Sequence, residues 1–277
     1  MNLAPAYAHC EGVARQEDRD RWLGALFAPA ALRPHLHALI AFEREMGRLR
    51  ANVRDPRAGE IRLVWWREAL AGAREEEARG HPVATAMRDT LERVRPPPHL
   101  IENALAARQF DLYDDPFATV VDLEAYLGET RSGMLQIAAL ALSEGRDPGA
   151  AEASGLAGVA LGLVELLRGL AQPRPPAFAP REVLERHGAS AEDFRERRET
   201  PELAAALADL IALARRRLGE AEAARAKLPR ALAPAYAGLA TAPLWLDAAG
   251  RSVARLAAPE VAAWRRQWAL WRWSRRP

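Results

Sequence analysis

Apolar residues between positions 32 and 53 recur at intervals of three and four, which is the spacing of one buried face of an α-helix. The face consists of Leu36, Leu39, Ile40, Met46, Leu49 and Val53. Glu43 falls inside this apolar stripe. An unpaired charge is costly to bury, so a carboxylate at such a position is either paired with a cation or faces a cavity. The pattern therefore predicts an arginine partner or a cavity at Glu43.

The same periodicity extends over most of the chain, whereas the two-residue alternation of strands is almost absent. Breaks rich in proline and glycine divide the pattern, and none is long enough to link two domains. We expect a single all-α domain over residues 1–277, built from roughly ten helices around one centre. Residues 1–18 could be flexible at its start, and residues 257–277 are expected to form an amphipathic C-terminal helix.

Three segments show how the pattern assigns helix faces. Residues 203–227 are expected to run as one long amphipathic helix with arginines on its outer face. The glycines of residues 158–170 lie inside a helical pattern with no preceding strand, which favours close helix packing over a phosphate-binding loop. In residues 60–78 the predicted inward positions are Ile61, Trp65, Ala69 and Leu70.

Composition excludes several function classes. Net charge is only +2, and arginine alternates with glutamate along most segments, so no broad basic surface for nucleic acid is expected. Neither C-x-x-C nor H-E-x-x-H occurs, which argues against zinc, and a single cysteine fits a reducing cytoplasm. No apolar run reaches the ~18–20 residues of a spanning helix. We expect a cytoplasmic protein that is at most peripheral on the inner membrane.

The C-terminal segment combines aromatic and basic side chains. Trp264, Trp268 and Trp271 share one helical face, and Arg265 and Arg272 lie beside it. Such a face can lie on an anionic membrane surface or against a partner. Alternatively, the tryptophans close the bundle and the arginines are solvated. The sequence leaves both interpretations open.

Six segments, in this order and spacing, resemble the squalene/phytoene synthase superfamily. They are residues 18–50, 59–70, 106–135, 157–170, 178–190 and 265–273. The resemblance covers nearly the whole chain and is closest to a proteobacterial branch similar to the mitochondrial complex I assembly factor of this fold. It implies an isoprenoid-synthase-type helical bundle around a central cavity, which is lined by neighbouring antiparallel helices at residues 32–53 and 155–170.

Active members of this superfamily hold Mg²⁺ and a prenyl diphosphate between two aspartate-rich helices. The departing diphosphate must be stabilised by Mg²⁺, which hard oxygen ligands hold, and by basic side chains. The resemblance places the following residues where the aspartates and glutamate of the two motifs would stand: Gly47, Arg48 and Ala51 in the first, and Gly169, Gln172 and Pro173 in the second. It therefore implies that both metal-binding motifs are lost. No cofactor is expected, and Mg²⁺ would be needed only by an active enzyme.

Two carboxylates remain on the predicted cavity side, because Glu43 and Glu165 lie one turn before Gly47 and Gly169. We expect both to be paired with arginines, the candidates being Arg44, Arg48 and Arg168. A replacement metal site at Asp111, Asp114 and Asp115 is the weaker interpretation of that segment, which is typical of a helix end and turn.

Three functions compete at this stage. We favour a family member that has lost prenyl transfer and acts by binding a protein partner, a respiratory-complex subunit, in complex I assembly or maturation. The alternatives are an active prenyltransferase that condenses two isoprenoid diphosphates, and a carrier of an isoprenoid or other lipid.

Overall fold

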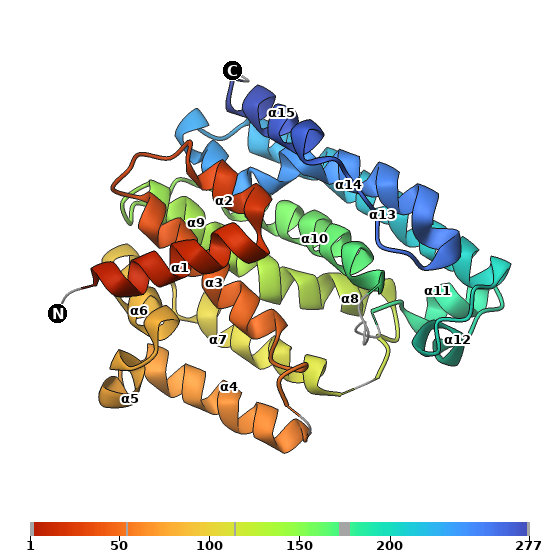
Figure 1. The fold of residues 1–277 in the computed structure, drawn as a ribbon, viewed down its shortest axis with the longest axis horizontal. Coiled ribbons are helices and arrows are strands. Elements are labelled where there is room, and N and C mark those ends of the chain that lie inside the picture. The colour runs from red at the N-terminus through yellow and green to blue at the C-terminus, as the bar shows by residue number, and fades with distance from the viewer. Residues whose placement is uncertain (1–2, 54, 114, 172–177, 276–277) are drawn as a thin grey trace.

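The computed structural model describes residues 3–53, 55–113, 115–171 and 178–275 (Figure 1). Every regular element in these ranges is helical, which confirms the all-α prediction. The α-helices are α1 (Ala4–Glu17), α2 (Arg19–Ala25), α3 (Arg33–Gly47), α4 (Pro56–Leu70), α5 (Glu75–Arg79), α6 (Pro82–Val94), α7 (His99–Ala107), α8 (Val120–Leu127), α9 (Gly133–Leu142), α10 (Ala151–Arg168), α11 (Arg181–Arg186), α12 (Ala191–Arg195), α13 (Pro201–Ala226), α14 (Gly238–Ser252) and α15 (Ala263–Ser274).

These helices outnumber the predicted ones because α5, α11 and α12 are only five or six residues long and fall between the longer periodic segments. Shorter 3₁₀ elements occur at Arg108–Leu112, Gly169–Ala171, Arg230–Tyr236 and Val253–Arg255. One π-helical turn, Gly128–Ser132, joins α8 directly to α9. The long helix predicted over residues 203–227 is confirmed as α13.

Local sequence signals explain where several helices begin. Proline occupies the first turn of α3, α4, α6 and α13, where its missing N–H costs no helical hydrogen bond. The side chain of Asp18 accepts a hydrogen bond from the backbone N–H of Arg21 and so caps α2. Asp18 thereby stands, with a fixed orientation, at the junction of α1 and α2.

Helix α10 lies in the middle of the bundle, where it packs against α13, α14 and the π turn (Figure 1). Helix α1 packs on α3 and α6, and its Cys10 and Ala14 are fully buried. Residues 4–17, which the sequence left as a segment that could be flexible, thus form a helix of the core. Most of the buried apolar side chains from α1 to α15 belong to one continuous cluster.

The predicted apolar face is confirmed within α3, where Leu36, Leu39, Ile40 and Met46 are buried together with Glu43. The helix ends at Gly47, earlier than predicted, so Leu49 is buried beyond it and Val53 is only half-buried. The prediction for α4 was partly wrong. Ile61 is 71% exposed, and Trp66 rather than Trp65 is fully buried. Helix α4 carries two apolar stripes, and packing against its neighbours selects the one through Leu63, Trp66 and Ala69.

The glycines of α10 allow the close packing that the sequence predicts. A Cβ atom at Gly158 would lie 2.5 Å from the backbone nitrogen of Ser132, and one at Gly162 would meet Leu127 at 2.6 Å. The hydroxyl of Ser132 also donates a hydrogen bond of 3.0 Å to the carbonyl of Gly155. Close approach to α10 therefore fixes the position of the π turn.

The C-terminal helix is shorter than predicted, since residues 257–262 precede it without helical structure. It packs on α2 and α14 along the outer edge of the molecule (Figure 1). Within the described ranges, none of the helices combines the length and apolar character that crossing a membrane requires.

Candidate functional site

A cavity of about 660 Å³ opens beside α3, α10 and the π turn. Five of the expected cavity-facing residues line it: Glu43, Gly47, Ala51, Glu165 and Gly169. The other two do not. Arg48 forms ion pairs with Glu17 and Glu45, and the guanidinium of Arg168 lies 4.0 Å above the ring of Trp245.

One side of the cavity is apolar. Phe110 and Phe117 stack with their ring centroids 4.2 Å apart. Further apolar side chains on the wall are Leu112, Leu127, Leu166 and Phe178. The 3₁₀ segment Arg108–Leu112 brings Phe110 and Leu112 to this wall.

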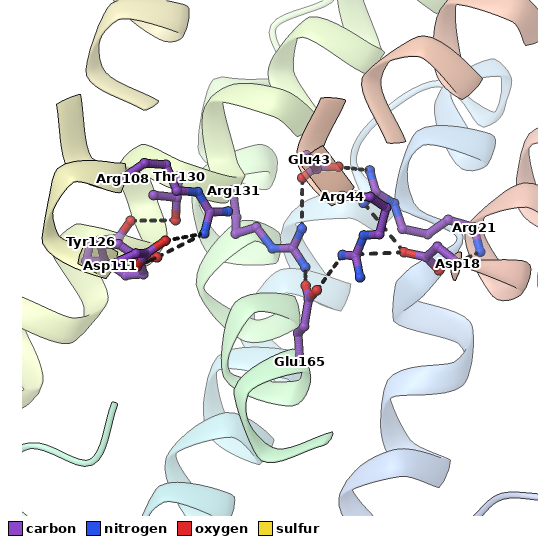
Figure 2. A network of polar contacts seen from close by, with 10 residues as sticks. All are labelled: Asp18, Arg21, Glu43, Arg44, Arg108, Asp111, Tyr126, Thr130, Arg131 and Glu165. Atoms are coloured by element: carbon purple, nitrogen blue, oxygen red, sulfur yellow. Dashed lines mark hydrogen bonds and ion pairs between the residues drawn. The ribbon is translucent and has the colours of Figure 1, made fainter. Parts of the chain in front are cut away.

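On the other side, three cavity-lining residues belong to a closed ring of six alternating charges, which we call the charge ring (Figure 2). Its successive members are Asp18, Arg21, Glu43, Arg131, Glu165 and Arg44, and Arg44 returns to Asp18. Each member therefore forms two ion pairs, one with each neighbour in the ring. The members come from α2 and its cap, α3, the π turn and α10, so the ring joins elements distant in sequence.

Glu43 and Arg131 are the most buried pair of the ring. Glu43 is 3% exposed and lies between Arg21 and Arg131, with 2.9 Å between its Oε1 and Nη1 of Arg131. Arg131 also pairs with Glu165, so its guanidinium lies between the carboxylates of α3 and α10 (Figure 2). These three residues border both the main cavity and a smaller one of about 50 Å³ behind it.

The structure pairs both predicted carboxylates with arginines, although largely with different ones. Arg44 was a correct candidate, because it pairs with Glu165. Arg48 and Arg168 were wrong, and the sequence pattern missed Arg21 and Arg131. No periodic signal marks Arg131, because it lies in the π turn itself, where the α-helical register is interrupted.

Burial and neighbouring arginines have opposite effects on the pKa values of Glu43 and Asp18 in the charge ring. Burial alone would raise the pKa of the Glu43 carboxyl, but Arg21, Arg131 and Arg44 together hold that pKa below its usual value. The pKa of Asp18 is lowered in the same way, against its burial, chiefly by Arg44 and Arg21. Both carboxylates are therefore ionised at neutral pH.

The pKa of Arg131 is also lowered, but here burial prevails over the charged partners. Burial lowers its pKa to about 10, although Glu43 counteracts this shift. Because that value is far above neutrality, Arg131 stays a cation. Asp18, Glu43 and Arg131 are therefore all charged at pH 7.

The free energy of unfolding should depend on pH through the carboxylates of this ring. Because Glu43 and Asp18 titrate lower in the folded state than in the unfolded chain, their contribution is complete above pH ~4.5, the ordinary range of carboxyls, and is lost as pH falls through the folded values. Urea unfolding of wild type and Glu43→Gln between pH 7 and pH 3 should show a stability difference that narrows on acidification. A difference independent of pH would contradict this assignment.

A second polar cluster lies on the cavity wall. Asp111 accepts hydrogen bonds of 2.9 Å from Arg108 and 2.5 Å from the hydroxyl of Tyr126. Tyr126 also accepts one of 3.0 Å from Arg108. Burial, together with the nearby Asp111, raises the pKa of Tyr126 despite the opposing charge of Arg108, so its phenol stays protonated.

This arrangement gives little support to a replacement metal site. Asp111 is already bonded to Arg108 and Tyr126, Asp115 lines the cavity, and Asp114 lies outside the described residues. Within the described ranges, no three histidine, cysteine or acidic side chains come close enough together to hold a metal ion.

Comparison with known proteins gives one family and one fold. Residues 14–272 match the squalene/phytoene synthase family. NADH dehydrogenase (ubiquinone) complex I, assembly factor 6, is 25% identical in Rattus norvegicus over 236 residues, which is 84% of this chain and 71% of that protein. The Homo sapiens protein of the same name is 25% identical over 232 residues, which is 82% of this chain and 69% of that protein. The bifunctional protein CrtB/UppS of Streptomyces coelicolor is 31% identical over 198 residues, which is 70% of this chain and 34% of that protein.

Solved structures share the fold. A dehydrosqualene synthase in complex with a ligand superposes with a TM-score of 0.79 at 19% identity, over 98% of this chain and 96% of that one. The squalene synthase HpnC of Alicyclobacillus acidocaldarius superposes with a TM-score of 0.67 at 21% identity, over 91% of this chain and 93% of that one. These likenesses establish the isoprenoid synthase fold.

Proposed function

The chain belongs to the squalene/phytoene synthase family, and from this premise we propose that it acts by binding, in the assembly or maturation of respiratory complex I, rather than by prenyl transfer. The names of its assembly-factor relatives in rat and human support this role. In this proposal its partner is a subunit of the respiratory complex, and the protein works in the cytoplasm at the inner membrane.

The charge ring is the observation that carries the non-catalytic part of the proposal. An Mg²⁺-diphosphate site needs several carboxylate oxygens that are available to the metal. Each acid of the ring is already shared between two arginines. Arg131 pairs with Glu43 of α3 and with Glu165 of α10 and so places a cation between the two carboxylates.

The positions that the resemblance assigns to the metal-binding acids add no ligand. Gly47, Ala51 and Gly169 line the cavity without an oxygen-bearing side chain. Arg48 is directed to Glu17 and Glu45, and Gln172 and Pro173 lie outside the described residues. The donor set therefore does not fit Mg²⁺, and we propose that the protein uses no metal cofactor.

The function is tested by deleting the gene in its source organism and measuring assembled complex I and NADH:quinone oxidoreductase activity in membranes. We expect both to fall and to recover with the wild-type gene. In parallel, the purified protein is incubated with farnesyl or geranylgeranyl diphosphate and Mg²⁺, and diphosphate release is measured. We expect none. Turnover would overturn the non-catalytic proposal, and normal complex I in the deletion strain would overturn the assembly role.

The apolar wall of the cavity favours a second candidate, the binding of an isoprenoid or other lipid. A space of about 660 Å³ bordered by Phe110, Phe117 and Leu166 has the volume and surface chemistry of a small-molecule pocket. Native mass spectrometry of the purified protein checks this alternative, because a carrier should retain an extractable lipid.

A further inference from the structure

Helix α15 has two opposite apolar faces, and only one of them is covered by the protein. The inner face carries Arg266, Leu270 and Trp273, of which Leu270 is 1% and Trp273 6% exposed. At about 100° per residue, Trp264, Trp268 and Trp271 fall on the opposite side of the helix. They are 69%, 55% and 42% exposed, so the tryptophans that the sequence could have assigned to bundle closure face outward.

The inner face is firmly attached, which shows that α15 is a fixed helix rather than a loose end. Arg266 forms an ion pair with the buried Asp20 on α2. The indole N–H of Trp273 donates a hydrogen bond of 3.2 Å to the carbonyl of Ala233, and the guanidinium of Arg225 lies 5.1 Å from the Trp273 ring. The outward tryptophans are therefore held in a defined position on the surface.

The charges on α15 itself have one sign. Arg265, Arg272 and Arg275 are exposed, and α15 contains no acidic residue. Among the ion pairs of the described residues, none involves Arg265 or Arg272. Arg230 adds a further exposed cation next to the helix, where it donates a hydrogen bond of 2.7 Å to the carbonyl of Ser274.

We propose that the outer face of α15 docks on an anionic phospholipid surface. Indole rings favour the boundary between headgroups and acyl chains, and arginines favour anionic headgroups. The exposed stripe lies on a helix at the outer edge of the molecule (Figure 1), which allows all three rings to meet a flat partner at once. An interfacial helix of this type lies in the plane of the membrane and does not cross it.

Two features favour a membrane over a protein as the occupant. Trp268 and Trp271 stack on each other with centroids 4.8 Å apart, and Arg275 lies over Trp271 at 4.5 Å, so the face is a continuous aromatic ridge. Helix α15 also lacks an acidic residue that would pair with a basic protein partner, whereas its unpaired arginines match a uniformly negative surface. This inference does not depend on the proposed function.

The test is co-sedimentation of the full-length protein with vesicles of phosphatidylcholine alone or with one third phosphatidylglycerol. We expect binding to the anionic vesicles that weakens with salt. Arg265→Gln with Arg272→Gln should reduce partitioning roughly 30-fold, since each charge near an anionic surface contributes a factor of about five. Replacement of Trp264, Trp268 and Trp271 by alanine should reduce it by roughly tenfold or more.

The matched control is Ile61→Ala with Val121→Ala, which removes two equally exposed apolar side chains elsewhere on the surface. This variant should bind vesicles like the wild type, and circular dichroism should show that all variants are folded. No vesicle binding by the folded wild type would overturn the proposal, as would equal losses in the control and tryptophan variants. If a protein partner is instead recovered by the wild type and lost by the tryptophan variant without any lipid binding, the proposal is likewise wrong.

Discussion

Glu43→Gln is expected to lower the free energy of unfolding by about 3 kcal/mol or more, the effect of removing one member of a buried ion pair. Glu43 is 3% exposed and lies between Arg21 and Arg131, which would both lose an anionic partner. The amide retains the shape of the side chain but not its charge, so the charge ring would keep three cations against two anions. Urea denaturation at pH 7 measures the loss.

Glu165→Gln is the matched control for this effect. Glu165 occupies the equivalent place in the ring but is 35% exposed, so solvent screens its two ion pairs. We expect a loss of about 1 kcal/mol or less. Unchanged stability of Glu43→Gln, together with failure to restore complex I in the deletion strain, would show that the carboxylate binds a ligand and that the ring is not structural.

Gly158→Ala is expected to destabilise the protein by about 3 kcal/mol or more, at the upper end of the cost of overpacking a core. The added methyl group would meet the hydroxyl and the backbone of Ser132, whose nitrogen would lie 2.5 Å away. A backbone atom cannot rotate aside as a side chain can. The π turn that carries Arg131 would have to shift, so thermal and urea unfolding should both show the loss.

Gly155→Ala, one turn earlier on α10, provides the control because nothing lies within 4 Å of its added methyl group. Alanine is the better helix former by about 1 kcal/mol, so this variant should be slightly more stable than the wild type. Equal destabilisation of both variants would show that helix α10 is sensitive to any added side chain, and would contradict a specific contact between Gly158 and Ser132.

The sequence predicted those features that depend on local periodicity. The three-and-four spacing identified the buried face of α3 and, with it, Glu43 as a buried carboxylate in need of a partner. The same spacing identified α13 as one long helix. These predictions hold because each depends on residues within a few turns of one another.

Features that depend on tertiary context could not be predicted from the sequence. Helix α4 carries two apolar stripes, and only packing decides that Trp66 is buried and Ile61 exposed. The outward orientation of Trp264 likewise depends on which face of α15 meets α2 and α14. The partners Arg21 and Arg131 come from α2 and the π turn, outside the helix that carries Glu43, so no helical spacing rule connects them to Glu43.

The π turn Gly128–Ser132 also makes the cavity wall sensitive to chain length. A π turn holds one residue more than an α-helical turn, and this one stands within the continuous helical segment formed by α8 and α9. Deletion of one residue there would let the helix run on regularly, and α8 would rotate by about 100° relative to α9. Tyr126 and Leu127 would then turn away from the cavity that they line. A single codon thus separates this pocket from a differently lined one, without any change of side chain.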